Sequence, residues 1–176
     1  NLLKELDGRP ALEVLAEILS EIDPQEQEQV AHSLFLGIAM DTMKETYGPG
    51  DFLIRNLMGS DPEEGHILVA SRLYQGRTVQ FHLRDAKASA SDLDAVLSSF
   101  IERHQGSGYT GALLFSCLGR GQDLYGHPNH DSECFQHYLG RIPLAGFFCN
   151  GEIGPVSGMT HLHGYTSCFG IFRAKE

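Results

Sequence analysis

The 176-residue sequence has no uninterrupted apolar run close to the roughly 20 residues that a membrane-spanning helix needs. It also has no low-complexity tract and no internal repeat, and its 20 glycines follow no collagen-like period. Basic residues are scarce and scattered, and the formal net charge of -10 repels phosphate backbones. We therefore expect a folded globular protein that has neither a membrane nor a nucleic acid as its partner.

Cysteines are few as well, and no two of the four form a Cys-x-x-Cys pair. An even number would permit two disulfides in an oxidising compartment. However, Cys117, Cys149 and Cys168 lie in or beside apolar, strand-like segments, where a thiol behaves as a small buried hydrophobe. We expect reduced cysteines and a cytoplasmic location.

Helical spacing of apolar residues predicts several helices in a chain whose hydrophobic content of 41% is enough for one core. Proline suits the first turn of the first helix, and Asp23 with Pro24 gives the second helix a good start. Ser91 and Asp94 resemble a capping box for the third. The predicted helices span residues 10–22, a short segment after 23, residues 91–104 and residues 131–139.

Short apolar or alternating segments, separated by turn residues, predict the strands. Their short connections favour antiparallel hairpins. They span residues 34–40, 52–58, 66–72, 77–84, 111–117, 143–149 and 163–172. Together these patterns predict a single α+β domain, in which helices pack against a largely antiparallel or mixed β-sheet.

Glycines gather in the last third of the chain, where they alternate with Arg120, Asn150, Glu152 and His163. Glycine is used where the backbone needs a positive φ or where another group approaches it closely, so this pattern favours a shaped polar cleft. Tight sheet turns carrying ordinary surface polar residues would give the same pattern.

Two late segments resemble signatures of the FIST family (F-box and intracellular signal transduction). They are GALLFSCLGRG at residues 111–121 and PLAGFFCNGEIGP at residues 143–155, the second closing with LHGYT at residues 162–166. Weaker similar pieces occur at residues 6–11, 52–57 and 81–85. The resemblance spans nearly the whole chain and identifies residues 1–176 as a FIST C-terminal domain.

FIST domains resemble sensory input modules, and they also occur in F-box proteins that act as substrate receptors. The family implies a small ligand such as an amino acid, and one branch resembles haem-based nitric oxide sensors. A full member carries an N-terminal FIST domain before the C-terminal one. We therefore expect residues 1–31 to be a helical lead-in from the junction with that missing domain, and we expect a further signalling protein as a possible partner.

The ligand-binding residues that the resemblance indicates lie in the three late motifs. Arg120 can hold a carboxylate with a bidentate fork and Glu152 can accept from an ammonium group, so an amino acid or similar zwitterion would satisfy both. A mutual salt bridge between Arg120 and Glu152 is the structural alternative. The predicted set is Cys117, Gly119, Arg120, Asn150, Gly151, Glu152, His163 and Thr166.

Other functions remain open at this point. Cys117, His163 and Glu152 are the ingredients of a cysteine-dependent hydrolase, although an apolar strand would keep the thiol inert. Histidines in the 127–131 and 160–163 segments could bind a metal, but their spacing matches no standard site. Joint exposure of Tyr125 and Phe148 would favour a protein-interaction module. We expect a binding domain without catalysis, metal or cofactor.

Overall fold

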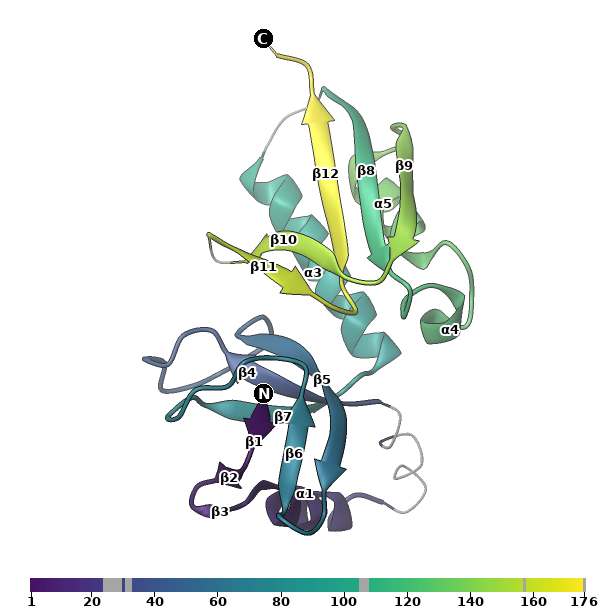
Figure 1. Ribbon diagram of the computed structural model, residues 1–176. Coiled ribbons are helices and arrows are strands. Elements are labelled where there is room, and N and C mark those ends of the chain that lie inside the picture. The colour runs from purple at the N-terminus through teal and green to yellow at the C-terminus, as the bar shows by residue number, and fades with distance from the viewer. Residues whose placement is uncertain (24–29, 31–32, 105–107, 157, 176) are drawn as a thin grey trace. The chain divides into compact units, whose positions relative to one another are not determined.

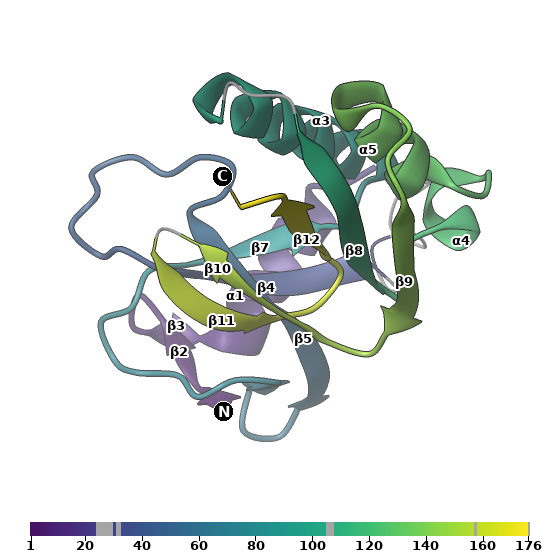
Figure 2. The same cartoon turned by 90° about the horizontal axis from the view of Figure 1, so that it is seen from above.

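The computed structural model describes residues 1–23, 30, 33–104, 108–156 and 158–175. Within this range the chain combines helices with antiparallel and mixed sheets, so the predicted α+β class is confirmed. It divides into two compact units, Asn1–Arg84 and Asp85–Glu176 (Figures 1 and 2). The second helix predicted after Asp23 lies outside the described residues.

The first unit is built on an antiparallel five-stranded sheet with the strand order β1-β6-β5-β4-β7. Helix α1 (Ala11–Ser20) packs on this sheet through Ala11 and Leu15, which are four residues apart and therefore on one side of the helix. The buried core comprises Leu3, Ala11, Leu15, Leu36, Ile67 and Val69. The strands are β1 (Leu2–Leu3), β4 (Leu34–Ala39), β5 (Phe52–Asp61), β6 (His66–Val69) and β7 (Val79–Leu83), with a separate pair β2 (Glu5–Leu6) and β3 (Arg9–Pro10).

The second unit has a three-stranded sheet with the order β12-β8-β9, in which β8 (Tyr109–Cys117) pairs antiparallel with β12 (Ser167–Arg173) and parallel with β9 (Leu144–Cys149). The parallel pair needs a crossover, and α4 (Gln122–Tyr125) and α5 (His130–Leu139) lie in that connection. A hairpin of β10 (Glu152–Val156) and β11 (Met159–His163) precedes β12.

Helices α3 (Ala86–Arg103) and α5 pack on one side of the β12-β8-β9 sheet. Their buried residues Leu93, Leu97 and Phe135 form a core with Ala112 of β8. The fully buried ring of Phe135 stacks on that of Phe169 in β12, with centroids 5.2 Å apart. This core fixes the ends of β8, β12 and α5 relative to one another, and the candidate site lies there.

Gly146 shows why glycine is needed in this sheet. It is the register partner of Leu114 in the parallel pair β8–β9, and a Cβ atom at this position would lie 1.8 Å from the Leu114 carbonyl oxygen. Only a residue without a side chain allows the two strands to approach so closely.

Two sequence predictions about this unit are wrong in detail. Helix α3 begins five residues before Ser91, because the Asp85 carboxylate accepts a hydrogen bond of 2.7 Å from the Ala88 N–H and forms the N-cap. The strand predicted over residues 163–172 is two strands, β11 and β12, separated by a turn in which Tyr165 has a φ of 63°.

Candidate functional site

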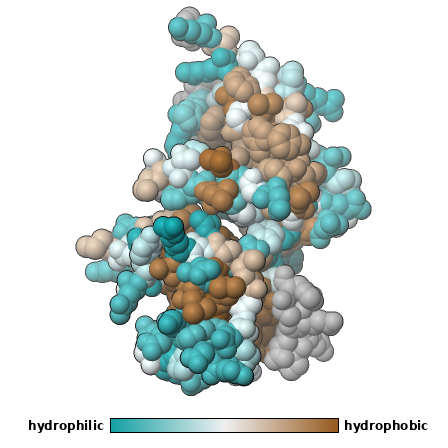
Figure 3. Space-filling view, viewed as in Figure 1, coloured by the Kyte–Doolittle hydropathy of each residue, from teal (hydrophilic) through white to brown (hydrophobic). Residues whose placement is uncertain are grey.

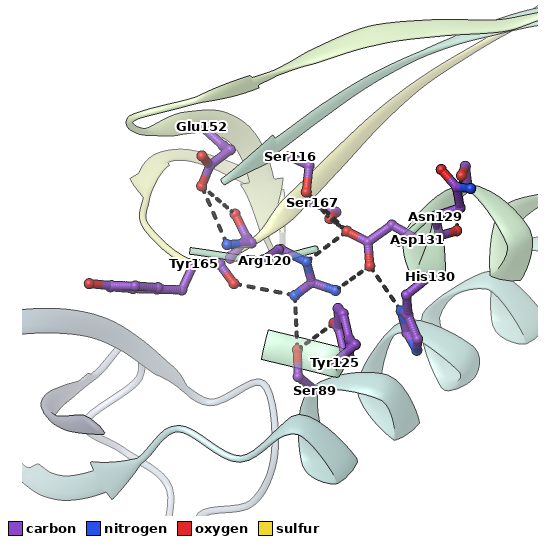
Figure 4. A network of polar contacts seen from close by, with 12 residues as sticks. Ser89, Ser116, Arg120, Tyr125, Asn129, His130, Asp131, Glu152, Tyr165 and Ser167 are labelled. Atoms are coloured by element: carbon purple, nitrogen blue, oxygen red, sulfur yellow. Dashed lines mark hydrogen bonds and ion pairs between the residues drawn. The ribbon is translucent and has the colours of Figure 1, made fainter. Parts of the chain in front are cut away.

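A network of polar side chains lies in the second unit, where the end of β8, the start of β12 and the start of α5 meet (Figure 4). Its centre is a bidentate ion pair between Arg120 and Asp131. The Arg120 Nε lies 2.8 Å from Asp131 Oδ2, and Nη2 lies 2.9 Å from Oδ1. Only 6% of the Arg120 side chain and 8% of the Asp131 side chain are exposed, so this is a buried pair.

Further hydrogen bonds complete both partners of the pair. The hydroxyls of Ser116 and Ser167 both donate to Asp131 Oδ2, and the His130 ring nitrogen Nδ1 lies 3.2 Å from Oδ1. Arg120 Nη1 donates to the Ser89 hydroxyl at 2.9 Å and to the Tyr165 carbonyl at 3.3 Å. The charges of this buried pair are therefore opposite, adjacent and well solvated by the protein.

The environment shifts the pKa of several groups in this network. Burial acts to raise the pKa of Asp131, but the hydrogen bonds from Arg120 and Ser167 and the charge of Arg120 outweigh burial and hold it well below its usual range. Burial also raises the pKa of Tyr125, whose hydroxyl lies 3.0 Å from the Ser89 hydroxyl. Asp131 is thus charged throughout the physiological pH range.

Glu152 is a second buried carboxylate in the same unit, and only 1% of this residue is exposed. It opens β10, and its Oε2 accepts hydrogen bonds from the Thr166 N–H at 3.3 Å and the Thr166 hydroxyl at 3.1 Å. Its Oε1 accepts a weaker bond from the Cys149 thiol at 3.4 Å. Burial and this contact with Glu152 raise the pKa of the Cys149 thiol.

The two carboxylates hold neighbouring residues of one turn. Arg120, fixed by Asp131, donates to the carbonyl of Tyr165, while Glu152 accepts from the next residue, Thr166 (Figure 4). The backbone N–H of Cys117 also donates to the Thr166 carbonyl at 3.0 Å. Residues from all three late motifs therefore converge on the turn at 164–166.

The remaining predicted site residues lie farther from the contacts at the turn at 164–166. His163 Nε2 lies 3.0 Å from the Gly154 carbonyl oxygen, and Gly151 is half-buried with a φ of 139°. Gly119 is half-buried and Asn150 is exposed. The structure thus brings Cys117, Arg120, Glu152 and Thr166 around one turn, with His163 and Gly151 on the adjoining hairpin and its approach.

The salt bridge between Arg120 and Glu152, which was the structural alternative to ligand binding, does not form, because the Arg120 guanidinium pairs with Asp131. Asp131, Ser116, Ser167 and Ser89 belong to the network but were not in the predicted set. A signal for Asp131 existed, because an arginine within an apolar signature needs a carboxylate partner and Asp131 begins a helix shortly afterwards. The sequence alone could not choose among the acidic residues nearby.

The other chemical alternatives find limited support in the geometry. Among the described residues, no three His, Cys, Asp or Glu side chains are arranged to hold a metal ion. His163 Nε2 lies beside the Gly154 carbonyl oxygen, and Glu152 accepts hydrogen bonds from Thr166 and Cys149, so the hydrogen bonds of these two side chains go to groups other than Cys117. All four cysteines are free thiols. Tyr125 is half-buried, and its ring stacks on that of His130 with ring centroids 3.6 Å apart. Tyr125 therefore forms no joint exposed patch with Phe148.

Within the described residues, no helix is long and apolar enough to cross a membrane.

Comparison with known proteins places the chain among longer polypeptides. It is 43% identical over 171 residues to an uncharacterised protein of Mycobacterium bovis, and 44% identical over 170 residues to an uncharacterised protein of Mycobacterium tuberculosis. Each match covers 97% of this chain but 44% of the relative, so the chain spans less than half the length of these proteins. A match to the human F-box only protein 22 is 32% identical over 71 residues, covering 40% of this chain and 17% of that protein. The family profile described as FIST C domain matches residues 11–155, and the chain therefore belongs to the FIST C domain family.

Proposed function

We propose that this chain is a sensory domain of a cytoplasmic signal-transduction protein, which binds a small metabolite through a positively charged group at Glu152 and does not itself catalyse a reaction. Membership of the FIST C domain family supports the sensory part of this proposal. The burial of Glu152 supports the ligand-binding part.

Glu152 differs from an ordinary structural carboxylate in the groups that contact it. Among the described residues, no Lys, Arg or His lies within ion-pair distance of Glu152, and its partners are two donors of Thr166 and one thiol. Removing an ionised carboxylate from water costs several kcal/mol unless a cation compensates it. A ligand ammonium group would supply that cation.

The acceptor atom available to such a ligand is Oε1. The Oε2 atom already accepts two hydrogen bonds from Thr166, whereas Oε1 accepts one contact of 3.4 Å from Cys149, and a thiol is a weak donor. An ammonium group is a much stronger donor and brings the opposite charge. We expect it to bind at Oε1.

The guanidinium of Arg120 is engaged by Asp131, Ser89 and Tyr165. The part of an amino acid that this site would recognise is therefore the ammonium group, and the proposal rests on Glu152 alone. Amines, amino-acid amides and free amino acids all carry this group, and they form the candidate ligand class.

Thermal-shift measurements with a panel of these compounds test the proposal. A ligand present at 100 times its Kd stabilises the folded protein by about 2.7 kcal/mol. For a protein of this size, each kcal/mol raises Tm by about 2–4 °C. We therefore expect a binding compound to raise Tm by about 5–10 °C, and the same compound to give no shift with the Glu152→Gln variant.

The matched control is Glu133→Gln, which neutralises an exposed carboxylate on α5. It should leave the ligand-induced shift unchanged. Circular dichroism establishes that each variant is folded before the ligand is added. A panel that stabilises neither the wild-type chain nor the control, or that stabilises Glu152→Gln equally, would overturn the proposal.

A further inference from the structure

We propose that the apolar side of the β12-β8-β9 sheet is covered by a region of the protein outside these 176 residues, corresponding to the part of the mycobacterial relatives that this chain does not match. This inference concerns a different surface from the Glu152 site. We call it the open sheet face, and it consists of Leu113, Phe115, Phe147 and Phe172.

The alternation of side chains along each strand identifies the two sides of the sheet. Ala112 and Ser116 of β8 face the helices, because Ala112 packs in the core with α3 and α5 and Ser116 donates to Asp131 of α5. Leu113 and Phe115 occupy the alternate positions between Ala112 and Ser116, so their side chains point to the opposite side of the sheet. In β12, Phe169 and Ile171 pack toward the same helical core, which places Phe172 on the open side.

The open sheet face is apolar and accessible. The exposed fractions are 37% for Leu113, 63% for Phe147 and 52% for Phe172, and the rings of Phe115 and Phe147 contact edge to face with centroids 5.3 Å apart. Figure 3 shows apolar side chains gathered over this sheet and over the adjoining hairpin. On that hairpin, the register partners Ile153 and Leu162 are 73% and 64% exposed. Contiguous apolar surface of this kind marks an interaction site in soluble proteins.

Strand β9 adds a second, independent observation. It is an edge strand of the three-stranded sheet, and its sequence Leu144–Cys149 contains neither a charged residue nor a proline. Native proteins protect exposed edge strands with charges, proline, bulges or a covering segment. Strand β9 has neither a charged residue nor a proline, and it lies beside the open sheet face. A covering segment would therefore protect this edge.

The lengths of the relatives indicate what covers this surface. The mycobacterial matches include 97% of this chain yet only 44% of each relative, and the match to the human F-box only protein 22 covers 17% of that protein. In each of these proteins the matching segment is accompanied by a larger stretch of polypeptide. A permanent, covalently attached neighbour suits an apolar surface, because obligate interfaces resemble a protein core cut in half.

Hydrogen–deuterium exchange provides the test. The 176-residue chain and the full-length protein that contains it are purified separately. Exchange of the β9 backbone amides in the two proteins is then compared by mass spectrometry. We expect exchange at β9 to be at least tenfold slower in the longer protein. In that protein, Phe147→Ser should return the β9 exchange toward the rate seen in the shorter chain.

Met43→Ser is the matched control, since Met43 is 88% exposed and belongs to the first unit. It should leave β9 exchange unchanged in both proteins. Equal β9 exchange in the two proteins would overturn the proposal. Protection of β9 that is already present in the 176-residue chain would also overturn the proposal, and protection that grows with protein concentration would identify a second copy as the cover. Protection that appears only after a separate partner protein is added would overturn it as well.

Discussion

Two buried carboxylates in the second unit are held in opposite ways. Asp131 lies in a bidentate ion pair with Arg120 and receives further hydrogen bonds from Ser116 and Ser167. Glu152 is even less exposed, yet its hydrogen-bond partners Thr166 and Cys149 are uncharged. The first carboxylate is compensated within the protein, and the second is not compensated by any described cation.

This difference separates a structural role from a recognition role. A compensated pair ties elements together, and here it links α5, the end of β8, β12 and the start of α3 through Asp131, Arg120, Ser167 and Ser89. A buried carboxylate without a cation partner lowers the stability of the fold and remains able to attract a cation. Arg120 and Glu152 both hydrogen-bond to the turn at 164–166. Ligand binding at Glu152 would therefore act on a segment that the Arg120 network also holds.

The largest expected effect follows from removing the guanidinium. Arg120→Met leaves Asp131 buried without its cation, and breaking one side of a buried pair costs about 3–5 kcal/mol. Urea unfolding of the chain, followed by circular dichroism, measures this loss. Arg9→Met is the control, because Arg9 forms solvent-exposed pairs with Glu13 and Glu17, and such pairs contribute little to stability. Equal effects of the two variants would contradict a structural role for Arg120.

Acidification should remove the same contribution gradually. The pKa of Asp131 is lowered in the folded state, so its stabilising effect is complete above the ordinary aspartate pKa of about 3.9 and is lost as the pH falls through the lower folded value. Each unit of that lowering corresponds to about 1.4 kcal/mol. The free-energy difference between wild type and Asp131→Asn should therefore shrink below about pH 4. A difference that stays constant from pH 6 to pH 2.5 would be inconsistent with this assignment.

A smaller effect is expected at the edge of the network. Ser89→Ala removes the acceptor of one Arg120 N–H and the partner of the Tyr125 hydroxyl, and leaving such groups unsatisfied costs about 1–2 kcal/mol. The exposed Ser20, whose hydroxyl donates only to the Glu17 carbonyl, is the control, and Ser20→Ala should change stability by less than about 0.5 kcal/mol. Urea midpoints at neutral pH compare the two. A Ser89 variant as stable as the Ser20 variant would show that the network ends before Ser89.

Regular patterns in the sequence predicted most of the framework. Apolar residues at helical spacing located α1, and the apolar run before Arg120 located β8 as an internal strand. Both signals are local, because the spacing of side chains within one element decides which side is buried. The beginning of α3 was missed because Ser91 and Asp94 resemble a cap, whereas the N-cap of the helix is Asp85, earlier in the chain.

The hairpin β10–β11 was missed for a different reason. Its first strand contains Gly154 and Pro155, which normally indicate a turn. Proline is tolerated here because β10 pairs only with β11 in its two-stranded sheet. Gly154 fits because a Cβ there would lie 2.8 Å from the Cys168 Sγ atom, a tertiary contact that no local pattern reveals.

The sequence named some residues of the candidate site but not the partner of Arg120, and the ligand-binding role of the named residues stays a prediction. The late motifs supply Arg120, Glu152, Cys117 and Thr166, which the structure brings together around the turn at 164–166. The partner of Arg120 depends on how the crossover through α4 and α5 returns to the sheet, and this decides in favour of Asp131 over Glu152. Long-range topology of this kind cannot be read from residue spacing.

The most direct test of the account compares the free energies of unfolding of wild type, Asp131→Asn and Glu152→Gln at neutral pH without ligand. Asp131→Asn leaves the Arg120 guanidinium buried without its anion and should cost about 3–5 kcal/mol, whereas Glu152→Gln replaces a buried carboxyl group that has no cation partner among the described residues and should leave the stability unchanged or raise it. A loss for Glu152→Gln as large as that for Asp131→Asn would contradict the separation of structural and recognition roles.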